Sequence, residues 1–185
     1  MPRPPSTHVL PMTAFVPAAA EATSATIRPW RDDEVDRRGH DPRSAYVERF
    51  WLGVIGPTAT WIMRRFADEF DHRPEGYILD LQHTATSMGL SFARGDQSPF
   101  GKALHRCVMF GLARRSADGF DVRRCFPTVA QRHLKRLPDD IRISHDDWAR
   151  RVIHVDRSQL AARLAEVGLT PPAAARAAEA AALAS

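Results

Sequence analysis

Basic side chains are concentrated in one segment of this sequence. Residues 98–136 contain nine Lys or Arg residues and only two acids, Asp118 and Asp121, so the segment carries a net charge of +7, whereas the whole chain carries +4. Such a segment is suited to binding a polyanion. The alternative is a solvated basic face without a partner.

The spacing of these residues separates two tasks on DNA. Lys102 and Arg106 lie four residues apart, on the helical face opposite the apolar side chains, where they can reach the edges of bases. His105 borders this face, and its position suits a DNA contact no better than it suits a side chain that makes none. A second group shares one helical face and suits phosphate contacts, which carry no base information: Arg132, Lys135 and Arg136.

Between these two groups, two extended segments carry four more arginines. Because side chains alternate along a strand, Arg123 and Arg124 must point to opposite sides, so that one can contact phosphate while the other packs against the domain. The predicted DNA-binding residues are Ser98, Lys102, His105, Arg106, Arg114, Arg115, Arg123, Arg124, Arg132, Lys135 and Arg136.

Enzyme signatures are missing from the sequence. Ser144, His145 and Asp146 are adjacent, but neighbouring side chains point apart, whereas a catalytic triad must converge in space. The eight histidines lack the spacings of zinc sites, and there is no glycine-rich phosphate loop. Cys107 and Cys125 are predicted to be buried reduced thiols, with a redox switch as the less favoured alternative. We therefore predict no catalytic residues, no metal site and no cofactor.

Local signals place these residues on a series of short elements. Pro57 fits the first turn of a helix, Asp80 the cap of a second, and Ser98-Pro99 the start of a third. Asp118-Gly119 is typical of a tight turn between two strands. The expected elements are a helix over 57–72, a strand over 77–79, helices over 81–88 and 99–111, strands over 112–116 and 120–126, a basic helical stretch over 129–137, and a helix through about 153 that Ser144 and Asp147 cap.

The composition divides the chain into three parts. Residues 1–42 are rich in proline and are predicted to be a disordered arm, in which only Trp30 is suited to docking. Residues 44–155 carry the helical periodicity of a folded domain, and residues 156–185 predict an alanine-rich helical hairpin or tail. No apolar run is long enough to cross a bilayer, and the N-terminus is a poor signal peptide, so a cytoplasmic protein without membrane contact is expected.

The order of these elements resembles the winged helix-turn-helix superfamily. The stretch from Leu104 to Ala113, with a hydrophobic helix ending in Gly-Leu-Ala before a basic hairpin, is similar to the same junction in MarR and GntR regulators. The chain also resembles actinobacterial proteins of unassigned activity that carry the motifs found here at 56–61, 110–113 and 132–138. It departs from the MarR pattern in its short wing and in lacking a long helix before the first helix of the domain.

The predicted fold is mainly α with a small β-hairpin, a winged helix-turn-helix with extra C-terminal helices. The resemblance implies a transcriptional regulator that binds double-stranded DNA, with the third helix in the major groove and the hairpin on the backbone. The alternative is a winged helix that serves as a protein-interaction or assembly module without sequence-specific DNA binding. The sequence is compatible both with a monomer and with a homodimer.

Overall fold

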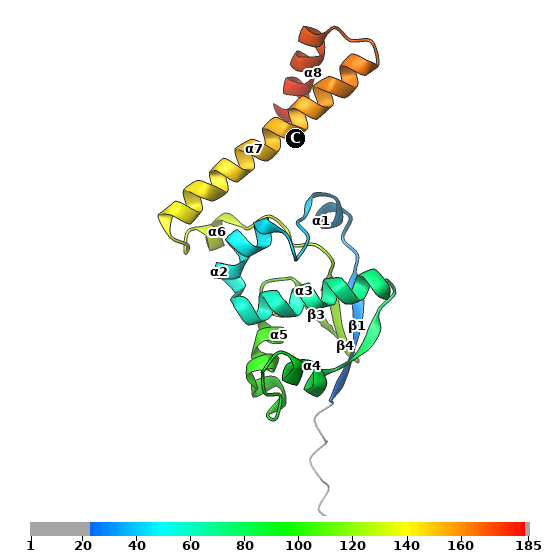
Figure 1. The fold of residues 1–185 in the computed structure, drawn as a ribbon, viewed down its shortest axis with the longest axis vertical. Helices are drawn as coiled ribbons and strands as arrows, with labels where there is room; N and C mark the ends of the chain where they lie inside the picture. The colour runs from blue at the N-terminus through cyan, green and yellow to red at the C-terminus, as the bar shows by residue number, and fades with distance from the viewer. Residues whose placement is uncertain (1–22, 184–185) are drawn as a thin grey trace, which may run out of the picture.

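The protein is mainly helical, with one small sheet of four strands (Figure 1). The computed structural model describes residues 23–183, except for the side chains of 152–156 and 182–183. Among these residues, no helix combines the length and the apolar composition that a bilayer span requires.

The sheet has the strand order β2-β1-β4-β3. β1 (Ser24–Trp30) runs antiparallel to β2 (Tyr77–Asp80) and parallel to β4 (Gly119–Arg123), which forms a hairpin with β3 (Ala113–Ser116). The tight turn predicted at Asp118-Gly119 is confirmed. The hairpin is therefore separated from β2 by a strand that precedes every helix of the domain.

β1 shows that the predicted disordered arm is wrong for the part that the structure describes, while residues 1–22 lie outside that part. The strand alternates, with Ala25 and Ile27 buried on the inner face of the sheet and Arg28 on the other face. β2 pairs with β1 only as far as Ile27. Pro29 lies beyond this paired stretch, where β1 is an edge strand on the β2 side and the N–H that proline lacks is not needed for pairing. A Cβ at Gly119 would lie 2.0 Å from the Thr26 carbonyl oxygen, so this glycine allows β1 and β4 to pair.

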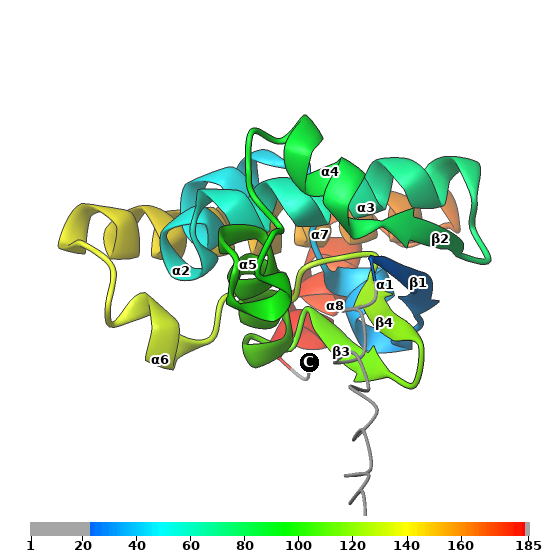
Figure 2. The same ribbon diagram turned by 90° about the horizontal axis from the view of Figure 1, so that it is seen from below.

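The helices α3 (Pro57–His72), α4 (Leu81–Ser87) and α5 (Pro99–Met109) lie on one side of the sheet (Figure 2). They begin where the sequence predicts. Pro57 is in the first turn of α3, Asp80 accepts a hydrogen bond from the His83 N–H at 2.8 Å, and Ser98 accepts one from the Gly101 N–H at 3.0 Å. The core lies between these helices and the inner face of the sheet.

Short helical segments connect this core to the rest of the chain. α1 (Asp33–Arg38) follows β1, and η1 (Val47–Trp51), a π-helical segment, leads into α2 (Leu52–Ile55). A 3-10 turn, η2 (Gly95–Gln97), precedes α5, and α6 (Gln131–Leu134) follows the hairpin.

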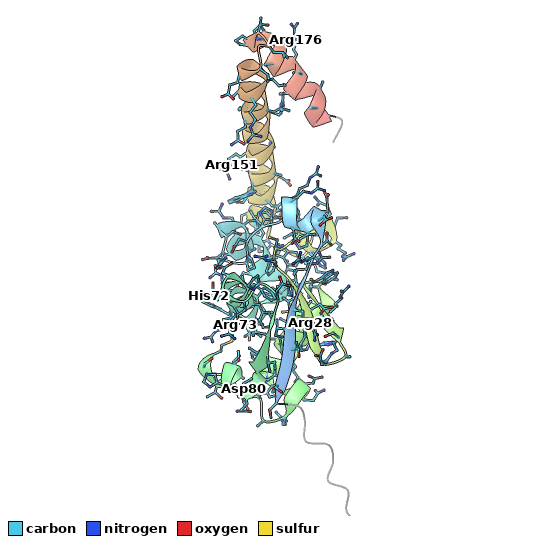
Figure 3. The ribbon with its side chains drawn as sticks, turned by 90° about the vertical axis from the view of Figure 1, so that its right-hand side faces the viewer. Arg28, His72, Arg73, Asp80, Arg151 and Arg176 are labelled. Carbon is cyan, nitrogen blue, oxygen red and sulfur yellow. The ribbon has the colours of Figure 1, made fainter. Side chains whose placement is uncertain are left out.

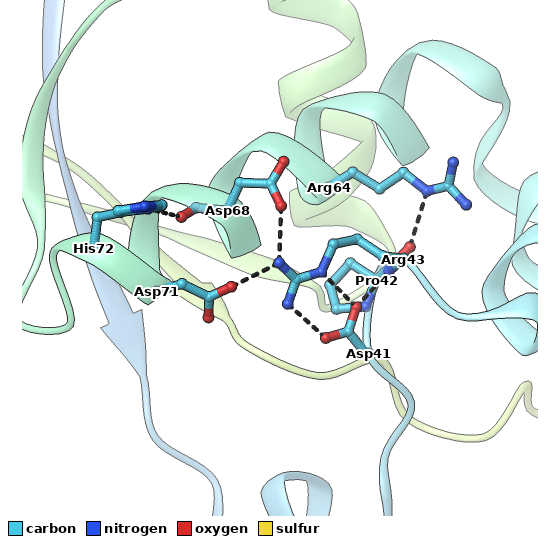
Figure 4. Close-up of polar contacts among 7 residues, drawn as sticks. All are labelled: Asp41, Pro42, Arg43, Arg64, Asp68, Asp71 and His72. Carbon is cyan, nitrogen blue, oxygen red and sulfur yellow. Dashed lines mark hydrogen bonds and ion pairs between the residues drawn. The ribbon is translucent and has the colours of Figure 1, made fainter.

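Arg43 fixes the segment before η1 to the end of α3 (Figure 4). Its guanidinium donates to Asp41, Asp68 and Asp71 at 2.7–2.9 Å, and these three carboxylates raise its pKa. The cluster is exposed, so its role is to orient the chain rather than to add much stability.

The C-terminal part is built differently from the prediction. α7 (Asp139–Glu166) is one helix of 28 residues that begins directly after Pro138, so the capping box predicted at Ser144 and Asp147 is wrong. Asp139 and Asp140 favour a start there because carboxylates stabilise the positive end of the helix dipole. The predicted boundary at residue 156 lies inside this helix, so the domain and the tail share a continuous element.

α7 and α8 (Pro171–Leu183) form the predicted helical hairpin, which projects away from the sheet (Figures 1 and 3). Ala174 and Ala178 are buried between the two helices, and Arg157 pairs with Glu179 at 3.0 Å. Figure 3 shows Arg176 near the tip of this projection and Arg151 between the tip and the domain, both away from Arg28 in the sheet. Among the described side chains, those of the first half of α7 pack on the domain, through Ile141, His145 and Trp148.

Candidate nucleic-acid interface

α5 presents two opposite faces because its sequence is amphipathic. Phe100, Leu104 and Cys107 are buried on the inner face. The outer face carries exposed side chains at the spacing i, i+3, i+4, i+7, which are Lys102, His105, Arg106 and Met109. Ser98 is 1% exposed, and its hydroxyl donates to the Gly95 carbonyl oxygen, so this residue caps the helix rather than facing a ligand.

Arg106 is held at the junction between α2 and α3. One guanidinium nitrogen donates to the Ile55 carbonyl oxygen at 3.2 Å, which is one of the last carbonyls of α2. The same nitrogen would lie 2.9 Å from a Cβ at Gly56, whose φ of +80° also favours glycine. Lys102 and Arg106 line a cleft of about 140 Å³ beside the first turn of α3. This contact fixes part of Arg106 and leaves its other donors for a ligand.

α6 has only four residues, so Arg132 lies in it, whereas Lys135 and Arg136 lie in the turn directly after it and not in the longer helix over 129–137 that the sequence predicts. Figures 1 and 2 both place α2, α5 and α6 together on the side away from β1. The Phe110 and His133 rings are 5.0 Å apart, and Leu137 lies close to Gly53 of α2. We use the term basic face for five exposed cations, Lys102, Arg106, Arg132, Lys135 and Arg136.

The basic face has little opposing charge. Its members have no salt bridge to a carboxylate within the part of the chain that the structure describes, and the nearest acid along the sequence, Asp139, pairs with Arg142. Burial, followed by the neighbouring Arg132 and Arg136, lowers the pKa of His133, which favours its neutral form. The five Lys and Arg side chains supply the permanent positive charge of the basic face.

The hairpin arginines, in contrast, are paired with acids. Arg114 donates to Asp121 at 2.9 Å and Arg115 to Asp96 at 2.6 Å. At the turn, Asp118 accepts two hydrogen bonds from Arg28, which hold the pKa of its carboxyl well below the usual range. The hairpin is thus nearly neutral, although the sequence predicts a basic wing.

Arg123 is part of the domain's packing. Its side chain is 13% exposed and donates to Asp32 at 2.6 Å and to the Gly111 carbonyl oxygen at 2.8 Å. The guanidinium lies over the Trp30 ring, 3.9 Å from the centroid, and Arg114 lies 4.9 Å from the same ring. Hydrogen bonding from Arg123 lowers the pKa of Asp32. Of the two neighbouring arginines, Arg123 is thus the one that packs against the domain, on the face of β4 opposite the buried Phe120 and Val122.

Arg124 is exposed after β4 and has no salt bridge among the described residues. Two acids that pair with the hairpin, Asp32 and Asp96, were not predicted from the sequence. No local signal could have found them, because each lies far from its partner along the chain.

Other candidate chemistry does not converge. His145 is buried with its Nε2 2.9 Å from the Tyr46 hydroxyl, whereas the Asp146 carboxylate is exposed and 4.0 Å from Nδ1. Burial raises the pKa of the Cys107 thiol to about 12, which makes it a poor nucleophile at neutral pH. Within residues 23–183, leaving aside the undescribed side chains, no three metal-binding side chains form a group.

Comparison of the chain with family models, with curated proteins and with solved structures finds no significant match.

Proposed function

We propose that this protein binds double-stranded DNA through the basic face and acts as a winged-helix regulator of transcription. The observation that carries the proposal is the division of the cations. The hairpin arginines Arg114, Arg115 and Arg123 are neutralised by Asp residues, while the basic face has five cations with no carboxylate partner among the described residues. An unpaired, exposed cluster of this kind attracts phosphates.

The order of α3, β2, α4, α5 and the β3–β4 hairpin supports the same proposal, because it matches the element order of a winged helix. α5 carries Lys102 and Arg106 toward the edges of bases, where a bidentate guanidinium discriminates best. The cations around α6 position the protein on phosphates. The hairpin serves chiefly as structure in this proposal, since its arginines already have partners.

The salt dependence of duplex binding tests the proposal. Five neutralised phosphates predict a slope of about −4.5 when the logarithm of the association constant is plotted against that of the salt concentration. Fluorescence anisotropy with a labelled 20-bp duplex of random sequence measures this slope. Absence of binding at low salt would overturn the proposal and favour the protein-interaction module.

A matched pair of variants locates the interface. Lys135→Ala/Arg136→Ala removes two cations of the basic face and should reduce the slope by about 1.8. Arg37→Ala/Arg38→Ala changes the net charge equally on α1, where both side chains pair with Glu34. This control should retain the full slope. Equal losses in the two variants would show that only the overall charge matters and that the basic face is not the interface.

A further inference from the structure

Trp61 is unusual among the aromatic residues because it is 55% exposed, whereas Trp51 is 2% exposed. It lies on α3, one turn after Pro57 and Thr58. Exposing this much indole surface to water is unfavourable, and exposed aromatic residues are enriched in binding sites.

The Trp61 indole lines a hollow of about 290 Å³. The other residues of this hollow are Pro57, Thr58, Arg65, Met88 and Leu90. Pro57 and Thr58 also line the cleft that contains Lys102 and Arg106, so the two depressions adjoin each other at the first turn of α3. Among the described residues, no acidic side chain lines either depression. The two linings together include the Trp61 indole and three cations, Arg65, Lys102 and Arg106.

One face of the indole is already occupied. The Arg64 guanidinium lies over the ring, 5.2 Å from its centroid. Arg64 is held there by hydrogen bonds to Glu48 at 3.0 Å and to the Pro42 carbonyl oxygen at 3.2 Å, the second of which is drawn in Figure 4. Arg65, which follows Trp61 by four residues on the same helix, donates to the Ser87 hydroxyl at 2.9 Å and has no salt bridge among the described residues.

We propose that this hollow binds an unpaired nucleobase, which stacks on Trp61 while the adjoining backbone phosphate contacts Lys102 and Arg106. The ligand is thus a single-stranded segment of nucleic acid. A flat apolar platform next to cations is the combination by which proteins hold such strands, since every base has a π-face and every nucleotide a phosphate. The absence of acids around the two depressions favours a phosphate-bearing ligand over a cationic peptide.

This inference rests on the proposed function, because it uses two cations of the basic face. The inference goes beyond the proposed function because it assigns a role to Trp61, which need not touch an intact duplex. Bases inside a duplex are already stacked on their neighbours, so only an extruded or unpaired base can reach the indole.

Two labelled probes test the proposal on the full chain, a single-stranded dT15 and a blunt 20-bp duplex. Trp61→Ala should weaken dT15 binding about tenfold and leave duplex binding within about twofold, because stacking on an aromatic side chain contributes this much per base. Trp61→Phe keeps an aromatic ring and should retain most of the dT15 affinity. Binding of dT15 should also quench the tryptophan fluorescence of the wild-type protein, and Trp61→Phe should lose part of this quenching.

Each remaining outcome is informative. If dT15 affinity is unchanged in Trp61→Ala while the duplex binds, the base site is overturned and the proposed function stands. If Trp61→Ala loses both ligands equally, or Trp61→Phe loses as much as alanine, stacking is overturned. If wild type binds dT15 in a Trp61-dependent manner but not the duplex, the base site is supported and duplex binding is overturned. If neither probe binds, both proposals are wrong.

Discussion

Replacing Tyr46 by phenylalanine should destabilise the protein, because its hydroxyl serves two buried groups. Tyr46 is 2% exposed, and its oxygen accepts a hydrogen bond from the Val129 N–H at 3.0 Å and lies 2.9 Å from Nε2 of His145. These contacts join η1, the segment after the hairpin and the first half of α7. The phenyl ring of the variant would keep the stacking on His40, whose ring centroid is 3.5 Å away.

The magnitude follows from the two partners that the variant would leave unsatisfied. A buried polar group that loses its hydrogen bond costs about 1–3 kcal/mol, so with two such groups Tyr46→Phe should lower the free energy of unfolding by about 2–6 kcal/mol. Urea titrations followed by circular dichroism measure this difference. The loss should appear as a lower midpoint at unchanged slope, since the same surface is exposed on unfolding.

The only other tyrosine supplies a matched control. Tyr77 is 8% exposed, but its buried hydroxyl has no hydrogen-bond partner among the described residues. Tyr77→Phe removes the same atom without orphaning another group, so the change should be neutral or stabilising by up to about 1 kcal/mol. Equal destabilisation in the two variants would refute the reasoning, because it would show that the loss comes from the ring environment and not from hydrogen bonds.

Three further predictions concern buried side chains. Burial lowers the pKa of His145 and of His40 below the ordinary 6.5, so the unfolded state binds more protons below about pH 6.5 and the free energy of unfolding should fall as the pH is lowered toward 5. A urea midpoint that is unchanged or higher at pH 5 than at pH 7.5 would contradict this. Cys107→Ser should lower the free energy of unfolding by about 1–3 kcal/mol, because the position is fully buried and suits an apolar group. An unchanged urea midpoint together with a lost response to oxidants would instead indicate a redox switch. Arg123→Ala should lower the melting temperature, since it loses its contacts with Trp30, but should keep the salt slope of duplex binding; a slope reduced by about one unit would show that Arg123 contacts phosphate.

Several local features of the fold could be predicted from the sequence. The starts of α3, α4 and α5 follow from Pro57, Asp80 and Ser98, because a cap depends on groups within three residues of it. The hairpin turn follows from Asp118-Gly119 for the same reason. Predictions of this kind succeed where the partners are close along the chain.

The errors occurred where distant segments decide the outcome. β1 is a strand because β2 and β4 pair with it on either side, and the proline-rich sequence that contains it gave no sign of this. α7 begins directly after Pro138, and the local pattern around Ser144 could not show that the helix had already begun. In both cases the surrounding structure outweighs local preference.

The sequence by itself determined that the charge of this protein is concentrated between residues 98 and 136 and that the helices there are amphipathic. It could not determine which of those charges remain free. Asp32 reaches Arg123 across 91 residues, and Asp96 reaches Arg115 across 19. Because the energy of an ion pair depends on distance in space and on exposure to water, only the tertiary structure decided that the hairpin is neutralised and that the basic face is not.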